Sequence, residues 1–369
     1  MEKNRPRLTV RWWPLLLPIA LCALALQPGG TLAARSAGMF PDFVAMPDVT
    51  PRGVAVDKIG NVFVSVSQGT HIVVWKFAPD GTGPSFVADM GVGTIGGLMV
   101  TAEGDLYVAM AAGVASARGV WRIERKGRIG RLPGSENIFF ANGLAFDEVG
   151  TLYVTESVSP TVIVNGKPAG PGSIWRIPRG GEAGLWWRDD LLRGTGALNQ
   201  PVWFGANGIA YHHDTLYVTN TEQGTVLRIP VLEDGSRGEP DVWSLQPVPE
   251  SPLRPYFPPM GDGVVLDVHG NLYVAVLTHS AVVRINPEDL CQETVAVFTG
   301  VSPVGAPPDA PLDFPASLFF GTGKGERQNL FVTTLGNGRL LPPPLDQLFP
   351  WFGPGLVKID AGVPGEPLR

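Results

Sequence analysis

One sequence pattern occurs six times along this chain of 369 residues, and this repetition limits the fold more than any other feature. Each copy contains an apolar stretch, a short polar turn and a second apolar stretch, as in ANGLAFDEVGTLYVTES at residues 141–157. The copies open at Pro51, Ile95, Ala141, Asn207, Asp262 and Pro315. A pattern that recurs at such intervals indicates a repeat architecture in which each copy is one supersecondary unit.

A third apolar stretch follows every copy, and a fourth, more variable one follows most of them. The third stretches read HIVVWKF, GVWRIER, SIWRIPR, TVLRIPV, AVVRINP and GLVKIDA. The chain has 47 glycines and 36 prolines, and no long segment has the apolar spacing of a helix. These features predict an all-β fold, a six-bladed β-propeller with four-stranded antiparallel blades.

The two ends of the repeat region together contain the four strands of one blade. The sixth copy lacks its fourth stretch, whereas DFVAMPD, residues 42–48, precedes the first copy as SFVADM precedes the second. We therefore expect the N-terminal strand to supply the missing outer strand of the sixth blade. Such closure removes the unpaired strand edges that an open array would expose.

The first 34 residues predict a secretory signal peptide. Four basic residues within positions 3–11 precede an apolar core at residues 14–26, and small residues follow at 31–34. An uncleaved membrane anchor is the alternative, but the apolar core is shorter than the roughly 20 residues that a span needs. We expect residues 1–34 to be removed, leaving residues 35–369 as one secreted or extracytoplasmic propeller domain without a stable membrane span. The formal net charge of −6, without a Lys/Arg cluster in the mature chain, argues against a nucleic-acid partner.

The long insertions fall between the second and third strands or between copies, at 157–172, 190–206, 246–260, 301–315 and 336–354. In a propeller, both kinds of connection lie on the face where the inner strands begin. Insertions on one face of a repeat protein commonly form its binding face. We therefore expect a small-molecule substrate to bind there.

The equivalent position in the six copies holds Arg52, Gly96, Asn142, Asn207, Asp262 and Ala316. Amide and carboxylate oxygens without Cys or His suit a hard cation, calcium before another divalent cation. Asn142, Asn207 and Asp262 are thus candidate metal ligands, and a cation held there could polarise a carbonyl oxygen. The alternative is that these side chains only hydrogen-bond backbone where turn and strand meet.

Through ANGLAFDEVGTLYVTES, GANGIAYHHDTLYVTNT and GDGVVLDVHGNLYVAVLTHSAVVRINP, the chain resembles a known propeller family. This is the family of senescence marker protein, gluconolactonase and luciferin-regenerating enzyme; paraoxonase, diisopropyl fluorophosphatase and strictosidine synthase are more distant. The resemblance spans about residues 42–369. It implies a hydrolase in which Asn142, Asn207 and Asp262 face a central divalent cation, usually calcium. It also implies that Asp262 acts as general base or nucleophile.

The chain departs from this family at the first copy, where the family normally has a metal-binding Glu and this sequence has Arg52. A guanidinium has no acceptor atom and repels a cation. Either Asp48 or Glu156 replaces the missing ligand, or the metal is absent and Arg52 binds an anionic ligand.

Two histidines, His71 and His279, are predicted on loops of the same face. Because imidazole titrates near neutral pH, either could transfer protons, and we expect a catalytic role for His279 and a substrate-binding role for His71. The alternative for each is an ordinary surface histidine.

These observations predict an exported, metal-dependent hydrolase of a lactone or related ester, similar to gluconolactonase. The alternative is a non-catalytic propeller that binds a small anionic ligand, or a protein partner, on the same face.

Overall fold

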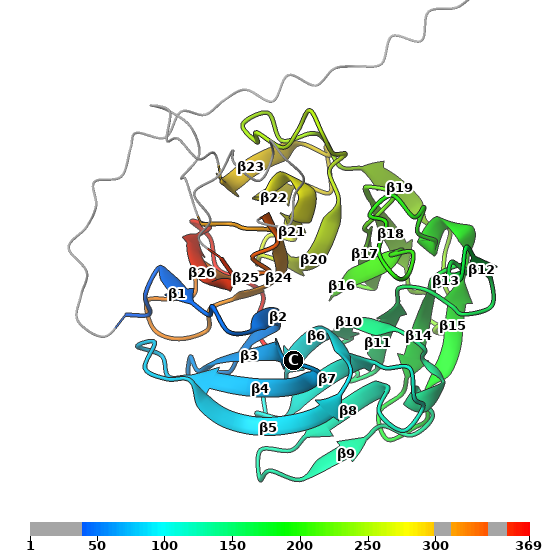
Figure 1. Ribbon diagram of the computed structural model, residues 1–369, viewed down its shortest axis with the longest axis horizontal. Coiled ribbons are helices and arrows are strands. Elements are labelled where there is room, and N and C mark those ends of the chain that lie inside the picture. The colour runs from blue at the N-terminus through cyan, green and yellow to red at the C-terminus, as the bar shows by residue number, and fades with distance from the viewer. Residues whose placement is uncertain (1–38, 299–310, 339–352) are drawn as a thin grey trace, which may run out of the picture. The chain divides into compact units, whose positions relative to one another are not determined.

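The protein is an all-β propeller, as the repeats predict (Figure 1). The computed structural model describes residues 39–298, 311–338 and 353–369. Six sheets, each of four antiparallel strands, make up the blades. Within these residues there is no α-helix; the 3-10 turns include η1 (Ser135–Asn137), η2 (Asp190–Leu192) and η3 (Leu277–His279). The same part of the chain contains no helix long and apolar enough to cross a membrane. The predicted signal peptide, residues 1–34, lies outside the described residues and stays a prediction.

Each blade begins with an innermost strand beside the central channel and ends with an outermost strand. Blade 1 contains β2 (Thr50–Val56), β3 (Val62–Gln68), β4 (His71–Phe77) and β5 (Ser85–Val92). Blade 2 contains β6 (Thr94–Val100), β7 (Leu106–Ala111), β8 (Gly119–Ile123) and β9 (Ile129–Arg131). Blade 3 contains β10 (Ala141–Phe146), β11 (Leu152–Glu156), β14 (Ser173–Ile177) and β15 (Gly184–Arg188).

The remaining blades follow the same order. Blade 4 contains β16 (Ala206–His212), β17 (Thr215–Asn220), β18 (Thr225–Pro230) and β19 (Asp241–Ser244). Blade 5 contains β20 (Gly261–Leu266), β21 (Leu272–Val276), β22 (Ala281–Ile285) and β23 (Gln292–Val297). Blade 6 contains β24 (Pro315–Phe320), β25 (Asn329–Thr334), β26 (Gly355–Asp360) and β1 (Phe43–Ala45).

The sixth blade is completed from both ends of the repeat region, which confirms the predicted ring closure. β1 pairs antiparallel with β26, Phe43 opposite Val357 and Ala45 opposite Gly355. Of the predicted insertions, 157–172 forms a small hairpin, β12 (Ile163–Val164) with β13 (Lys167–Pro168). Most residues of the insertions at 301–315 and 336–354 lie outside the described residues.

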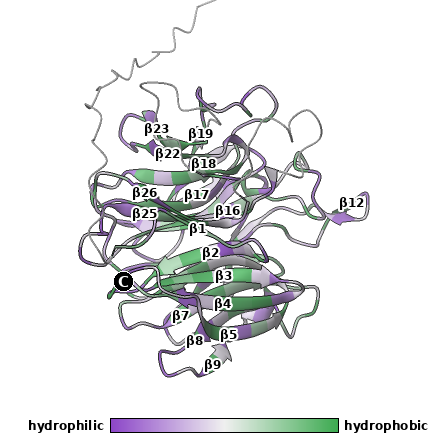
Figure 2. Ribbon diagram, turned by 60° about the vertical axis from the view of Figure 1, so that its left-hand side comes forward, coloured by the Kyte–Doolittle hydropathy of each residue, from purple (hydrophilic) through white to green (hydrophobic). Residues whose placement is uncertain are grey.

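Apolar side chains fill the spaces within and between the blades. Figure 2 shows hydrophobic residues concentrated in the strands and hydrophilic ones at the turns. The second strand of each blade is nearly all buried, as in VFVSV of β3 and LYVAV of β21. This burial explains the β-branched and aromatic residues of the repeat, which pack well on a pleated surface.

Every inner strand carries an irregularity at the position where the candidate site residues lie. In β10, Ala141 pairs with Glu156 and Leu144 with Val154, so the inner strand has one extra residue between these pairs. β16 has the same shift between Ala206 and Ile209. Such bulges redirect side chains and are common next to binding sites. They explain how Asn142 and Asn207 leave the regular alternation of the sheet.

Glycine follows the candidate site residue in four copies because neighbouring inner strands approach closely there. A Cβ added at Gly208 would lie 2.4 Å from the carbonyl oxygen of Asp262, and one at Gly143 would lie 2.5 Å from that of Asn207. Backbone atoms cannot move away as a flexible side chain can. The Asn-Gly, Asp-Gly and Arg-Gly pairs of the repeat are therefore a packing requirement as well as a site feature.

We expect Gly208→Ala to lower the free energy of unfolding by about 1–3 kcal/mol, the usual cost of overpacking. Gly184→Ala is the matched control, because a Cβ at Gly184 meets no atom within 4 Å and its backbone is not left-handed. Urea denaturation of both variants measures the difference. Equal stability of the two would contradict the close approach of β16 and β20.

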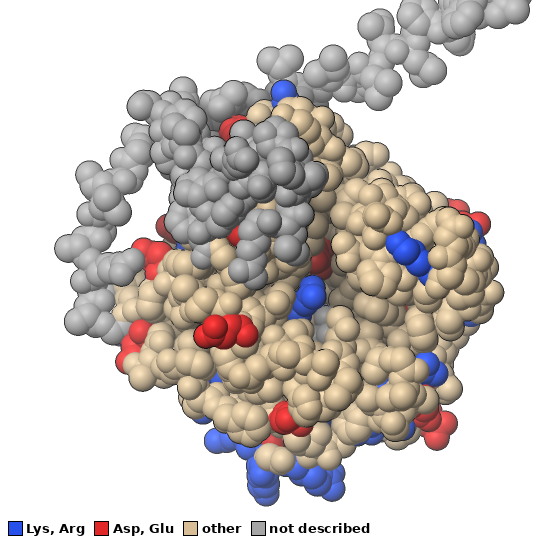
Figure 3. Space-filling model, in the orientation of Figure 1, with Lys and Arg blue, Asp and Glu red and all other residues tan. Residues whose placement is uncertain are grey.

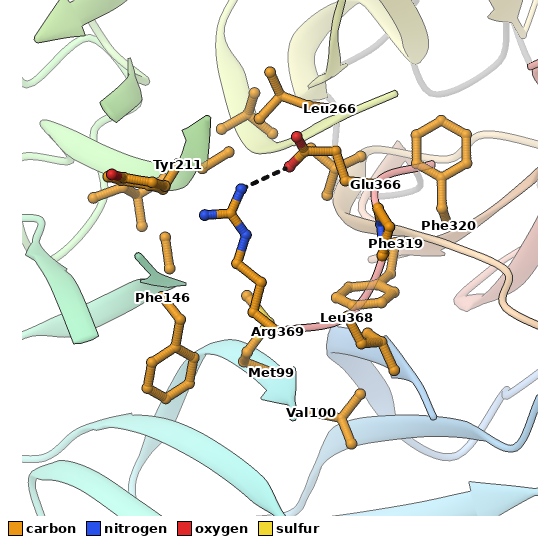
Figure 4. A pocket seen from close by; sticks show the side chains of 16 residues that line it. Met99, Val100, Phe146, Tyr211, Leu266, Phe319, Phe320, Glu366, Leu368 and Arg369 are labelled. Atoms are coloured by element: carbon orange, nitrogen blue, oxygen red, sulfur yellow. Dashed lines mark ion pairs between the residues drawn. The ribbon is translucent and has the colours of Figure 1, made fainter. Parts of the chain in front are cut away.

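Residues 363–369 cross the end of the channel opposite the candidate site. The backbone N–H of Val268 donates to the carbonyl oxygen of Pro364, and the backbone N–H of Ala102 donates to the carbonyl oxygen of Arg369. The Arg369 guanidinium lies 3.1 Å from Glu148 and 5.0 Å from the Tyr211 ring centre. Figure 4 shows Arg369 and Glu366 paired among apolar side chains such as Phe146, Leu266 and Phe319. A space of about 110 Å³ lies between this segment and the inner strands.

Candidate functional site

A cavity of about 460 Å³ lies at the start of the inner strands. Figure 3 shows a hollow near the centre of the face in view, with basic side-chain atoms at its edge. Arg52, Asn142, Asn207 and Asp262 all line the cavity, as do residues of the loops around its mouth. The structure thus brings together four of the residues singled out from the repeat, although they are up to 210 positions apart in sequence.

The two asparagines are held by hydroxyl groups from the end of the next strand in their own blades. Asn142 Nδ2 donates to Ser157 Oγ at 2.9 Å, and Asn207 Nδ2 donates to Thr221 Oγ1 at 2.9 Å. Because the Thr221 hydroxyl donates to the carbonyl oxygen of Gly261, it must accept from Asn207. That network determines which way the Asn207 amide faces.

Asp262 is the acidic group of the cavity. Burial away from water raises the pKa of its carboxyl to about 7, and the positive charge of Arg52 and a hydrogen bond from Asn207 oppose this rise. A carboxyl that titrates near neutrality, within a cavity, is suited to accept and return a proton.

Arg52 is the basic group of the cavity. Burial lowers the pKa of its guanidinium, and the attraction of Asp262 opposes the change. Its Nε is buried and has no hydrogen-bond partner among the described residues. Its backbone carbonyl accepts a hydrogen bond of 2.6 Å from Thr333 Oγ1 in blade 6, which positions the start of β2 independently of the side chain.

Apolar side chains from the loops form the outer walls of the cavity. Phe140 and Phe204 meet edge to face with ring centres 5.5 Å apart. Leu198, Phe257 and Phe314 line the wall as well. The cavity therefore combines one charged pair, Arg52 and Asp262, with a largely apolar lining that also includes the polar side chains of Gln200, Thr278 and Asn337.

Glu222 holds one of these walls and was not singled out from the sequence. Its buried carboxylate accepts backbone hydrogen bonds from Thr195 (2.7 Å), Gly196 (2.5 Å) and Leu198 (3.2 Å). Glu222 lies shortly after the second strand of its blade, at the repeat position that holds Val158 in blade 3. Repeat alignment alone does not reveal which loop such a carboxylate holds.

We expect Glu222→Gln to increase KM several-fold with little change in kcat, because an amide group cannot accept three N–H groups and the Leu198 loop would loosen. Faster amide hydrogen exchange at residues 195–198 should accompany the change. Glu239→Gln is the control, since the Glu239 side chain is 95% exposed. Unchanged exchange in that loop would contradict the role of Glu222.

His279 is fully buried and does not line the cavity. Its Nδ1 accepts from the backbone N–H of Val248, and its Nε2 donates to the carbonyl oxygen of Phe257. Burial lowers the pKa of its imidazole. Both ring nitrogens thus fasten the loop at 246–260, which favours a structural role over the predicted catalytic one.

His71 lies outside the cavity as well. Its side chain is 51% exposed at the start of β4, and its Nδ1 lies 2.9 Å from Asp89 Oδ2. The two suggested replacement ligands are also elsewhere. Asp48 is exposed, and Glu156 binds Phe139, Trp175 and Arg188 instead.

The cavity fits the calcium ion expected from the family resemblance poorly. Calcium takes roughly six to eight oxygen ligands, often several carboxylates. Asp262 supplies the single carboxylate among the described lining residues, and Asn207 directs a donor toward it. The Arg52 guanidinium adds a fixed positive charge in the same cavity. Among all described residues there is also no group of three or more His, Cys, Asp or Glu side chains that could hold a metal.

Fold and site together define a six-bladed propeller with one carboxylate and one guanidinium in a central cavity. No protein-family model matches the sequence, and no curated protein matches it either. Solved structures share the fold. A luciferin-regenerating enzyme is 15% identical, with a TM-score of 0.60 over 87% of this chain and 95% of that one.

Two further solved structures share the six-bladed fold. Regucalcin from Agrobacterium tumefaciens, described as a calcium-binding protein, is 14% identical, with a TM-score of 0.57 over 91% of this chain and 99% of that one. The gluconolactonase XC5397 from Xanthomonas campestris is 18% identical, with a TM-score of 0.55 over 88% and 91%. At these identities the likeness is one of fold.

Proposed function

We propose that the protein is an exported hydrolase of a lactone or related ester, with its reaction in the central cavity. The observation that carries the proposal is the Asp262 carboxyl, placed in the cavity beside Arg52 with a pKa raised to about 7. The gluconolactonase and luciferin-regenerating enzyme among the structural neighbours support this class. Export rests on the N-terminal residues of the sequence.

In this proposal ionised Asp262 accepts a proton from a water molecule whose oxygen attacks the acyl carbon. Negative charge develops on the carbonyl oxygen, and the Arg52 guanidinium stabilises it. The bond between the acyl carbon and the ring oxygen breaks, and the proton passes from Asp262 to the departing alkoxide. Water is thereby added across the ester bond, and the product is a hydroxy acid.

The proposed mechanism contains no metal step, because the charge of Arg52 and the scarcity of carboxylates fit a divalent cation poorly. The second candidate function, a non-catalytic ligand-binding propeller, is favoured by one observation. The unpartnered Nε of Arg52 is a recognition group for an anion whether or not chemistry follows.

A pH profile tests the hydrolase directly on a panel of lactones and aryl esters. Because the base must be ionised, kcat/KM should rise about tenfold per pH unit below pH 7 and level off above it. The folded protein retains the Asp262 proton up to about pH 7. A profile that is flat between pH 5 and 8, or no turnover across the panel, would reject Asp262 as the base.

A further inference from the structure

We propose that the central cavity binds a monocarboxylate with an apolar body, its carboxylate on the Arg52 guanidinium and its body between the phenylalanines that line the cavity. The inference deepens the proposed function, since hydrolysis of a lactone yields a hydroxy acid whose carboxylate includes the former carbonyl oxygen.

The charged side chains of the cavity favour a ligand that carries a single negative charge. Arg52 and Asp262 are the charged side chains among the described residues that line it. Asp262 attracts the guanidinium but leaves Nε without a partner. Burying a donor without a partner costs free energy, and a carboxylate, which can accept two parallel N–H bonds from Arg, satisfies it. A phosphate or dicarboxylate would carry a second charge, and the described lining residues offer no further cation for it.

The side chains that line the cavity favour an apolar ligand beyond its carboxylate. Phe140, Phe204, Phe257 and Phe314 line the cavity together with Leu198, and the polar side chains of Gln200, Thr278 and Asn337 line it as well. Hydrocarbon or aryl surface gains about 25 cal/mol per Å² when it is buried there, whereas hydroxyl groups of a polyol need hydrogen-bond partners. An aliphatic hydroxy acid therefore fits better than a sugar acid.

Calorimetric titration of the full protein with 4-hydroxydecanoate and with its uncharged amide tests the proposal. We expect the acid to bind about tenfold tighter than the amide, as a charge-assisted contact predicts. Arg52→Gln should abolish this difference by weakening the acid alone, and Arg52→Lys should restore part of it. Equal affinities for acid and amide in the wild type, or an acid affinity unchanged in Arg52→Gln, would overturn it. The variants should fold, because the Thr333 bond is to the Arg52 backbone.

Two comparisons complete the test. Gluconate should bind about tenfold or more weaker than 4-hydroxydecanoate, and equal binding would overturn the apolar body. Asp262→Asn should bind the acid more tightly, because it removes a competing carboxylate. If no lactone is turned over but the acid binds through Arg52, the hydrolase is rejected and this inference holds. If a lactone is turned over but the acid does not bind through Arg52, the hydrolase holds and this inference is rejected.

Discussion

Asp262→Asn is expected to reduce kcat for lactone hydrolysis by about 10²–10⁴-fold, the usual contribution of a general base. An amide cannot accept the proton of the attacking water, whereas the shape and the Asn207 contact are nearly retained. Steady-state kinetics with the best substrate of the panel measures the loss. Turnover equal to that of the wild type would remove Asp262 from the mechanism.

The free energy of unfolding of Asp262→Asn is the control, because it separates a loss of catalysis from damage to the fold. The unfolded chain loses the Asp262 proton near pH 4, whereas the folded protein retains it up to about pH 7. Ionising the buried carboxyl therefore costs folding free energy as the pH rises through this window. Asp262→Asn should be at least as stable as the wild type at pH 8. A lost activity with a lower unfolding midpoint would instead indicate damage to the fold.

Arg52→Glu is expected to create calcium-dependent stability that the wild type lacks. The substitution replaces the only described cation of the cavity with a second carboxylate facing Asp262, Asn142 and Asn207. At a free calcium concentration about one hundred times the dissociation constant, binding adds about 3 kcal/mol to the free energy of unfolding. Thermal melts with calcium and with a chelator measure the change.

Arg52→Gln separates the two effects of that substitution, because it removes the charge without adding a ligand. We expect at most a small calcium response from it. A clear rise in the melting temperature of the wild type with calcium would show that the guanidinium does not exclude the cation. The ligand set expected from the family resemblance would then apply after all.

The sequence predicted the architecture well because the same strand pattern recurs in six copies. Six copies make the apolar alternation and the turns recognisable even where one copy is irregular, as in blade 3 with its insertion at 157–172. The closure of blade 6 followed from counting strands. The convergence of Arg52, Asn142, Asn207 and Asp262 followed from their shared place in the repeat.

Features without a repeat could not be predicted in this way. His279 was expected to be catalytic because its loop lies on the binding face, but the loop at 246–260 folds over it and occupies both ring nitrogens. Glu222 acts on a loop that has no counterpart in the other copies. The segment at 363–369 lies beyond the last repeat, so nothing in the pattern indicated that it crosses the channel.

The closure of blade 6 also has a consequence for how the protein is made. β1 is among the first strands to be synthesised, and its partner β26 is among the last, more than 300 positions later. A ring whose final sheet joins such distant segments cannot be completed during synthesis, and contacts of this separation form slowly. The chain remains open, with β1 unpaired, until its last blade has emerged. During that interval the unpaired strand edges and apolar faces are exposed, so the chain is most prone to aggregate then.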